Sequence, residues 1–172
     1  MKNVFSFFII VLFISCTHSK KAVNYTTTKD GSRTVLKGII NRSIIENDTT
    51  FKWFKENMKY GMPDAAAVEA FKNKQDEFSL IVFGGTWCED TQNLWPRFFQ
   101  LIDKSGFPEK KIQLITVDLK KHTINNLHSQ FAIQNVPTFI VMHKGKEIGR
   151  VVEYGTMGDI TKELGAIVNG IR

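Results

Sequence analysis

The chain has 172 residues, with 23 Lys and Arg against 17 Asp and Glu, which gives a formal net charge of +6. This length allows one compact domain with its own hydrophobic core. The basic residues are scattered, no run of them exceeds two, and there are no internal repeats. The charge pattern therefore gives no indication of nucleic-acid binding.

Residues 1–15, MKNVFSFFIIVLFIS, contain one basic residue, Lys2, and then an apolar run from Val4 to Ile14. The run is shorter than the roughly 20 residues of a membrane-spanning helix. It is typical of the apolar region of a secretory signal peptide, although a buried core helix is the alternative. We therefore expect residues 1–15 to be a signal peptide and the protein to be exported.

Cys16 follows the small residue Ser15 at the end of this run. The arrangement resembles a bacterial lipoprotein signal, in which the cysteine is acylated and becomes the new N-terminus, but Phe13 replaces the usual leucine. The resemblance implies that Cys16 is a lipid anchor holding a lipoprotein to a membrane of the cell envelope, in the periplasm. The alternative is ordinary cleavage that leaves Cys16 free. With Cys16 acylated, Cys88 is the only free thiol and an intrachain disulfide is impossible.

Residues 16–33 are polar and aperiodic, and we expect a flexible tether there, with a domain over 34–172. RTVLKGIIN (33–41) predicts a short strand. A helix is predicted over 48–58, with Asp48, Thr49 or Thr50 as its N-cap, and another over 62–75.

The second half of the chain predicts an alternation of strands and helices. SLIVF (79–83) is apolar on both faces, as in a strand covered by helices on each side, and a helix with an internal proline, Pro96, follows to about residue 105. The remaining expected elements are a strand over 111–118, a short helix over 123–131, a hairpin of 138–142 with 147–152, and a closing helix over 159–168. This order predicts an α/β fold with a mixed central β-sheet flanked by helices.

The stretch IVFGGTWCEDTQNLWP (81–96) resembles the thioredoxin segment in which a strand, Trp-Cys and a helix containing a proline follow one another. Trp87 and Cys88 match the motif, and Pro96 lies eight residues after the cysteine. Val136-Pro137-Thr138 stands where the family carries a cis-proline. The resemblance covers residues 78–168. It implies the thioredoxin fold, preceded here by an N-terminal strand and helix extension, and a thiol–disulfide oxidoreductase activity.

Two departures from the family pattern affect the expected redox chemistry. The C-x-x-C motif becomes Cys88-Glu89-Asp90-Thr91, and Val82 replaces a buried acidic residue that the family often carries. Dithiol turnover is therefore not implied. A single thiol can still exchange with protein or small-molecule disulfides if an external thiol or a partner oxidoreductase clears the mixed disulfide.

We predict Cys88 and Thr91 as the catalytic residues. The unpaired N–H groups at a helix N-terminus favour a thiolate at Cys88, whereas the negative charges of Glu89 and Asp90 oppose it. Thr91 lies three residues on, on the same helical face, from which its hydroxyl can donate a hydrogen bond to the sulfur. The alternative is an inert, buried cysteine.

We predict substrate binding at Trp87, Val136 and Pro137. A cis bond before Pro137 would present the backbone of Val136 to Cys88, and in the family that edge pairs with an extended substrate segment. The alternatives are a packing role for Trp87 and a simple turn at Pro137. The four histidines have no ligand spacing with Cys88, and no phosphate-binding loop is present, so we expect neither a metal nor a cofactor.

Two functions remain open at this point. The first is single-cysteine thiol–disulfide exchange by a membrane-anchored, thioredoxin-like protein of the bacterial cell envelope. The second is a non-catalytic binding or chaperone module that keeps the peptide groove. A dimer joined through Cys88 is a third possibility.

Overall fold

The structure is a computed structural model, and it describes residues 23–172. The predicted signal peptide (1–15), the predicted lipid anchor Cys16 and the first part of the predicted tether lie outside the described residues.

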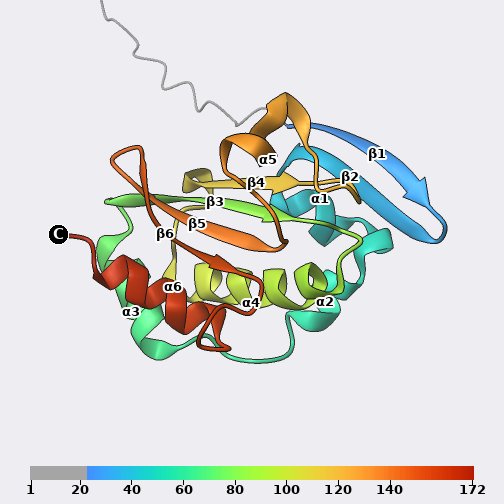
Figure 1. Cartoon of the computed structure of the whole chain (residues 1–172). Helices are drawn as coiled ribbons and strands as arrows, with labels where there is room; N and C mark the ends of the chain where they lie inside the picture. The colour runs from blue at the N-terminus through green and yellow to red at the C-terminus, as the bar shows by residue number, and fades with distance from the viewer. Residues whose placement is uncertain (1–22) are drawn as a thin grey trace, which may run out of the picture.

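A six-stranded mixed sheet with the order β1-β2-β4-β3-β5-β6 forms the centre of the molecule (Figure 1). Its strands are β1 (Asn24–Asp30), β2 (Arg33–Ile40), β3 (Phe78–Gly84), β4 (Ile112–Thr116), β5 (Thr138–His143) and β6 (Lys146–Val152). Only β3 and β4 pair in parallel, and the remaining pairs are antiparallel. The predicted fold class is confirmed, because two parallel strands lie beside the antiparallel hairpin of β5 and β6.

The alternation of side chains along β3 divides the apolar residues between two cores. Leu80 and Val82 point into the larger core, and Phe83 points into the smaller core on the opposite face. Both faces of β3 are therefore buried, as the apolar run predicted. Cys88 and Trp87 pack against the smaller core, which also contains Val136.

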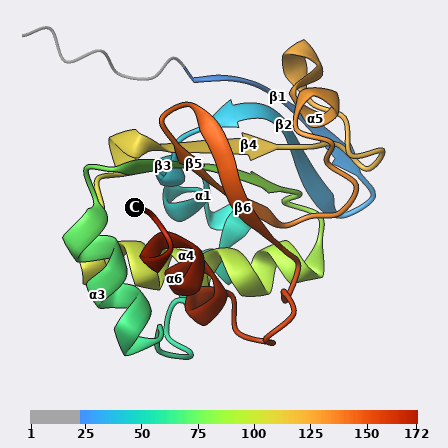
Figure 2. The same cartoon turned by 60° about the vertical axis from the view of Figure 1, so that its left-hand side comes forward.

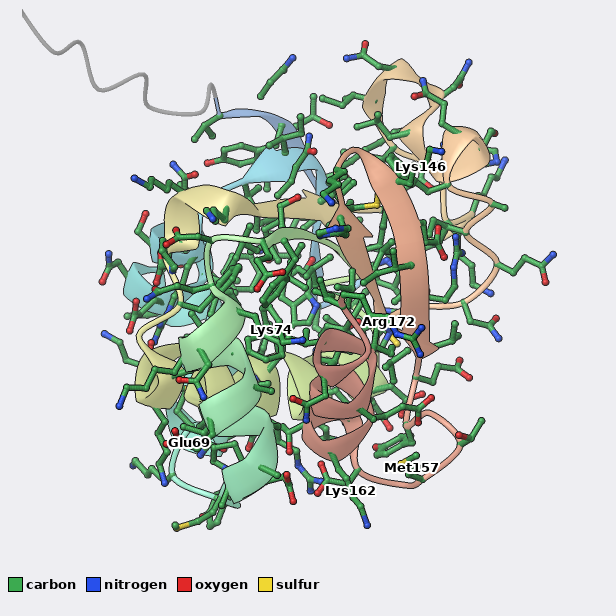
Figure 3. All side chains as sticks on the ribbon, turned by 90° about the vertical axis from the view of Figure 1, so that its left-hand side faces the viewer. Glu69, Lys74, Lys146, Met157, Lys162 and Arg172 are labelled. Carbon is green, nitrogen blue, oxygen red and sulfur yellow. The ribbon has the colours of Figure 1, made fainter. Side chains whose placement is uncertain are left out.

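The larger core is covered by helices that lie together on one face of the sheet (Figure 2). They are α2 (Trp53–Asn57), α3 (Ala65–Lys74), α4 (Glu89–Ser105) and α6 (Ile160–Asn169). Helices α3 and α6 approach closely because Gly165 has no side chain: a Cβ there would lie 2.5 Å from the Cβ of Ala67. In Figure 3, Lys74 lies near the C-terminus, and its Nζ donates a hydrogen bond to the Ile171 carbonyl at 2.6 Å.

The N-terminal extension contains more regular structure than the sequence indicated. Residues 24–33, expected in a flexible tether, form β1 and the turn into β2, so the ordered chain begins before residue 34. Strand β1 is mostly exposed and rich in threonine, and it has no apolar alternation to reveal it. Helix α1 (Arg42–Asn47) was not predicted either.

Two predicted helices are interrupted in the structure. Residues 48–58 divide into a 3₁₀ turn (Thr49–Phe51) and α2, and Asp48 caps the turn by accepting a hydrogen bond from the Thr50 N–H at 2.8 Å. Residues 123–131 divide into a 3₁₀ turn and α5 (Leu127–Gln130). Asn125 and Asn126 both have a φ of 52°, a left-handed conformation that asparagine tolerates better than most residues.

Arg42 joins the extension to α4. Its guanidinium binds both carboxylate oxygens of Asp103, at 2.5 and 2.9 Å, and lies 4.9 Å from the centre of the Phe99 ring. These contacts hold α1 on the same face of the sheet as α4. The extension is thus part of the domain.

Candidate active site around Cys88

Two glycines at the end of β3 create the space that the active-site loop needs. A Cβ on Gly84 would lie 2.2 Å from the Trp95 ring, and a Cβ on Gly85 would lie 2.7 Å from the Trp87 ring. Both distances are too short for a side chain, so only glycine allows the two indole rings to pack against this backbone. The Gly-Gly pair therefore fixes the position of the loop that carries Cys88.

Cys88 is the N-cap residue of α4, as predicted, and it is half-buried. Its backbone is extended, with φ −89° and ψ 125°, and its carbonyl accepts the Gln92 N–H at 3.0 Å. The Cys88 thiol donates a hydrogen bond to the Val136 carbonyl at 3.3 Å. That bond belongs to the protonated thiol, so ionisation of Cys88 has to break it.

The structure gives Thr91 a role different from the predicted one. Thr91 is fully buried, and its hydroxyl oxygen accepts the Gly85 N–H at 3.1 Å. No hydrogen bond between Thr91 and the Cys88 sulfur is found within residues 23–172. The expected pairing is therefore replaced by two bonds to other partners, and Thr91 acts on Cys88 by holding the preceding loop.

Val136 and Pro137 lie beside Cys88, and the peptide bond between them is cis. Val136 is 3% exposed and belongs to the smaller core, so its side chain is an anchor and its carbonyl is the group that meets the sulfur. Pro137 is buried, and its carbonyl accepts the Glu153 N–H at 2.8 Å. The structure thus brings together the cysteine and the backbone edge that the sequence placed near it.

Trp87 is half-buried beside the cysteine. Its indole N–H donates a hydrogen bond to the Val117 carbonyl at 3.1 Å. Asp118, the next residue, binds Lys37 Nζ at 2.8 Å and accepts two backbone N–H bonds, from Lys120 and His122. Burial acts to raise the pKa of Asp118, but the Lys37 bond and these backbone bonds outweigh it and lower the pKa. An ion pair between Asp118 and Lys37 therefore directly follows the residue that holds the Trp87 indole.

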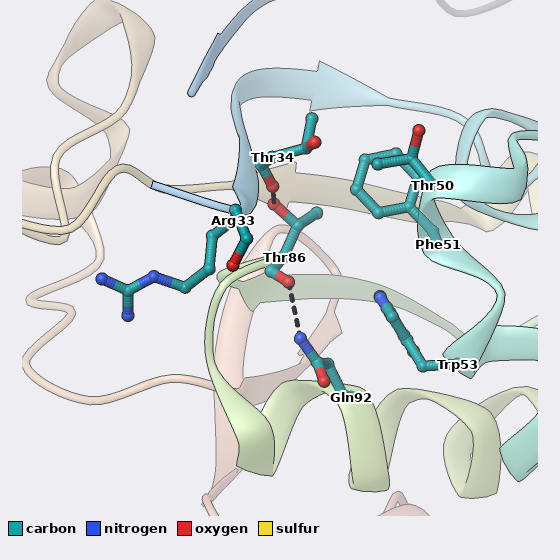
Figure 4. Close-up of a pocket in the computed structure, with 8 residues that line it drawn as sticks. Arg33, Thr34, Thr50, Phe51, Trp53, Thr86 and Gln92 are labelled. Atoms are coloured by element: carbon teal, nitrogen blue, oxygen red, sulfur yellow. Dashed lines mark hydrogen bonds between the residues drawn. The ribbon is translucent and has the colours of Figure 1, made fainter. Parts of the chain in front are cut away.

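Three polar residues near Cys88 were not predicted as part of the site. The Thr86 hydroxyl donates to the Thr34 carbonyl at 2.8 Å and accepts the Leu36 N–H at 3.1 Å, which ties the active-site loop to β2. Gln92 Nε2 donates to the Thr86 carbonyl at 2.9 Å (Figure 4). The only sequence signal for Thr86 and Gln92 was their closeness to Cys88, and Thr34 carried none.

Neither a metal site nor a membrane span is found in the described part of the chain. No three His, Cys, Asp or Glu side chains of residues 23–172 gather closely enough to hold a metal ion. His122 and His128 pack with ring centres 4.6 Å apart, and His143 Nδ1 lies 2.7 Å from the Glu77 carbonyl. Within the same residues, no helix has the length and apolar character needed to cross a bilayer.

The geometry around Cys88 is suited to nucleophilic chemistry by one sulfur. The half-buried sulfur lies at a helix N-terminus and beside a backbone edge, and it is the only free cysteine among the described residues. Thr91 occupies the position of a second cysteine but is buried. A disulfide formed at Cys88 therefore has no cysteine within residues 23–172 to resolve it.

Comparison with known proteins relates this arrangement to one family. No curated protein sequence is significantly similar to the chain. Among solved structures, an HIV epitope scaffold superposes with a TM-score of 0.53 and 16% identity, covering 78% of this chain and 94% of that one. A protein of unknown function from Pseudomonas aeruginosa gives 0.48 and 18%, covering 69% and 81%. The thioredoxin Deadhead from Drosophila melanogaster gives 0.41 and 16%, covering 60% and 90%.

The family result is more specific than the similarity to the HIV epitope scaffold, which shows the fold alone. The thioredoxin family profile matches residues 64–166, a segment that starts just before α3 and includes Cys88, Pro137 and most of α6. The matched segment is more than half of the chain. The chain therefore belongs to the thioredoxin family.

Proposed function

We propose that the protein carries out single-cysteine thiol–disulfide exchange at Cys88, on protein or small-molecule disulfides in the bacterial cell envelope. The observation that carries the proposal is the position of the sulfur, at the N-cap of α4 and 3.3 Å from the Val136 carbonyl. Unpaired N–H groups at a helix N-terminus favour a negatively charged sulfur. The family match supports an oxidoreductase role in general.

The exchange reaction proceeds in two steps, formation of a mixed disulfide and its release by an external thiol. The Cys88 thiolate attacks one sulfur of a disulfide, a bond forms between the two sulfurs, and the other substrate sulfur leaves as a thiolate that takes up a proton. An external thiolate then attacks the mixed disulfide, forms a disulfide with the bound group and releases Cys88. The external thiol belongs to a small molecule or to a partner oxidoreductase, because Thr91 has no sulfur to supply.

The Val136 edge provides a place for the substrate. An extended segment that pairs with the backbone beside Pro137 brings its own disulfide toward the Cys88 sulfur, since the Val136 carbonyl is already in contact with that sulfur. The incoming segment then competes with the thiol for this carbonyl. Trp87, fixed by its bond to Val117, forms one side of the approach.

The membrane location rests on the sequence of the N-terminus. The apolar run of residues 4–14 and the Ser15-Cys16 pair support export followed by acylation of Cys16. Acyl chains would keep the domain at a membrane surface. Disulfides persist in exported compartments, so substrates for Cys88 would be available there.

Replacing Cys88 with Ser tests the proposal. The C88S protein is expected to lose reduction of a small disulfide in the presence of an external thiol, because serine does not attack disulfides under these conditions. Cys16→Ser is the matched control, since it removes the other sulfur: it should keep the exchange rate in detergent and lose its association with membranes. Unchanged exchange by C88S would refute the proposal.

A binding or chaperone module without catalysis is the second candidate. It is favoured by the hydrogen bond that engages the Cys88 thiol and by the lack of another cysteine among residues 23–172. For this function, alkylation of Cys88 should be no faster than alkylation of a free thiol at each pH. C88S should then also retain full binding of extended peptides.

A further inference from the structure

A pocket of about 160 Å³ lies beside the Cys88 segment. Its walls come from the start of β2 (Arg33, Thr34), from the 3₁₀ turn and the first residue of α2 (Phe51, Trp53), and from Thr86 and Gln92, which lie before and after Cys88 in the chain (Figure 4). We propose that this pocket receives a neutral side chain of a substrate polypeptide, next to the disulfide that Cys88 attacks. The inference rests on the proposed function and adds a substrate preference to it.

The pocket wall and the reacting cysteine form one connected piece of backbone. Thr86 precedes Cys88 by two residues, and the Gln92 N–H donates to the Cys88 carbonyl at 3.0 Å. The Gln92 side chain closes this unit by donating to the Thr86 carbonyl at 2.9 Å. A substrate side chain that contacts Thr86 and Gln92 is therefore held at a fixed distance from the Cys88 sulfur.

The pocket lies on the side of Cys88 away from Val136. Strand β5, which follows Pro137, adjoins β3 on one side, whereas β4 and then β2 follow on the other. The Thr86 hydroxyl reaches Thr34 in β2, so the pocket belongs to that second side. A bound segment would therefore have to cross the Cys88 loop in order to occupy both the Val136 edge and the pocket.

The size of the pocket restricts its occupant. Sites for whole small-molecule ligands usually enclose about 300–1,000 Å³. A pocket of about 160 Å³ is too small for such a ligand but is sufficient for one side chain of a larger molecule. Because the pocket is close to Cys88, we expect this side chain to belong to a substrate residue near the disulfide that Cys88 attacks.

The lining favours an uncharged occupant. Arg33 is its only charged residue, and Figure 4 shows the guanidinium turned away from the other lining side chains; it pairs with Asp30. Phe51 and Trp53 supply an aromatic wall, with ring centres 6.4 Å apart at an angle of 74°. A charged side chain placed there would lose hydration without gaining a partner of opposite charge.

The pocket also offers one donor and one acceptor. The indole nitrogen of Trp53 is turned toward Thr86 and Gln92 in Figure 4, and it has no hydrogen-bond partner among the residues that the structure describes. Gln92 uses its Nε2 for the Thr86 carbonyl, which leaves its Oε1 as an acceptor. A glutamine or asparagine amide complements both groups, and its aliphatic part contacts the aromatic wall.

A series of peptide disulfides tests this inference on the full chain. Each peptide carries one cysteine joined to a small thiol by a disulfide. Gln, Ala or Glu is placed in turn at each of the four positions before that cysteine and each of the four positions after it. We expect Gln to exceed Ala by about tenfold in the second-order rate constant at one fixed position, with Glu slowest. Equal rates for all peptides would overturn the inference.

Filling the pocket gives an independent test. Thr50 lines the pocket and is exposed, and the bond from its backbone N–H to Asp48 survives substitution, so Thr50→Trp adds bulk without disturbing the core. T50W should lose the Gln preference and keep the rate with a small disulfide that has no peptide. Lys52→Trp, exposed and outside the pocket, adds the same bulk and should keep the preference.

The two proposals fail in different ways. If the small disulfide reacts normally and T50W keeps the full Gln preference, the pocket inference is wrong and the exchange function stands. If neither peptides nor the small disulfide exchange at Cys88, both proposals are wrong. Trp53→Phe, which keeps a ring but removes the N–H, should reduce the preference for Gln over Ala.

Discussion

The Cys88 loop contacts two regions of the molecule. One lies within the segment that matches the thioredoxin family, and the other lies outside it. On one side, Val136 and Pro137 come from the part of the chain that matches the thioredoxin family, and they meet the sulfur itself. On the other side, Thr34 and Trp53 come from the N-terminal extension, outside the matched segment, and they meet the loop and line the pocket. Under the two proposals, the shared fold positions the Cys88 sulfur, and the extension selects which substrate side chain lies beside it.

The two sides are also held in place by different forces. The Val136 side is fixed mainly by apolar packing in the smaller core, with Val136 almost fully buried. The extension is fixed to the active-site loop by the two hydrogen bonds of Thr86 and to α4 by Arg42. Substitutions that remove polar groups should therefore affect the extension more than the Val136 side.

The largest effect is expected for Thr86→Val. Valine keeps the shape but leaves the Thr34 carbonyl and the Leu36 N–H without a partner in a buried region, where each unpaired group costs about 1–3 kcal/mol. The free energy of unfolding in urea should fall by about 2–6 kcal/mol, the sum for the two groups. Thr86→Ser, which keeps the hydroxyl, is the control and should lose clearly less. Equal losses for the two variants would show that the hydrogen bonds do not hold the loop.

A smaller loss is expected for Arg42→Met. The methionine retains apolar contact with Phe99 but loses the paired bonds to Asp103, which should lower the free energy of unfolding by about 1–3 kcal/mol. Arg33→Met removes an exposed ion pair and should change it by less than about 0.5 kcal/mol. Exchange with a small disulfide should be unchanged in R42M, because Arg42 contacts neither Cys88 nor its loop. A large loss of exchange in R42M would show that the extension also affects the reactivity of Cys88.

The smallest effect concerns the pH dependence of stability at His128, which lies near Asp118 and Lys37. Desolvation, together with the nearby His122, lowers the pKa of His128, whose Nδ1 accepts the Thr123 N–H at 3.2 Å. The unfolded chain therefore binds a proton more readily than the folded one. Stability should decrease as the pH falls through the unfolded value of about 6.5, and should be regained above it. His128→Asn keeps an acceptor without titrating, so urea midpoints measured from pH 7.5 to 5 should show a flatter profile for H128N. An identical profile would exclude His128 as the cause.

The sequence predicted the parts of the fold whose signal is local. The apolar run of 79–83, the stripe that became α4 and the hairpin around residues 143–146 lie where expected, because burial on one or both faces leaves a periodic pattern. Strand β1 escaped prediction because its exposed, threonine-rich residues form a strand only by pairing with β2. Helix α1, with Ile45 as its one buried residue, gave no periodic signal either.

The candidate site divides in the same way. Cys88, Val136 and Pro137 were placed by motif, and the contact between sulfur and carbonyl followed from the fold they imply. The role of Thr86 depends on Leu36 and Thr34, which precede it by 50 and 52 positions in the chain. A local sequence pattern does not reveal contacts at that separation. Helical spacing predicted a hydrogen bond from the Thr91 hydroxyl to the sulfur, but in the structure the buried Thr91 oxygen accepts the Gly85 N–H at 3.1 Å.

The most direct test of the exchange mechanism is the intact mass of the reduced, full-length protein after incubation with a small disulfide, followed by peptide mapping. We predict one mixed disulfide on Cys88, stable in the absence of thiol and removed when an external thiol is added. A protein that acquires no adduct at Cys88 under conditions that modify a free thiol would contradict the mechanism at its first step.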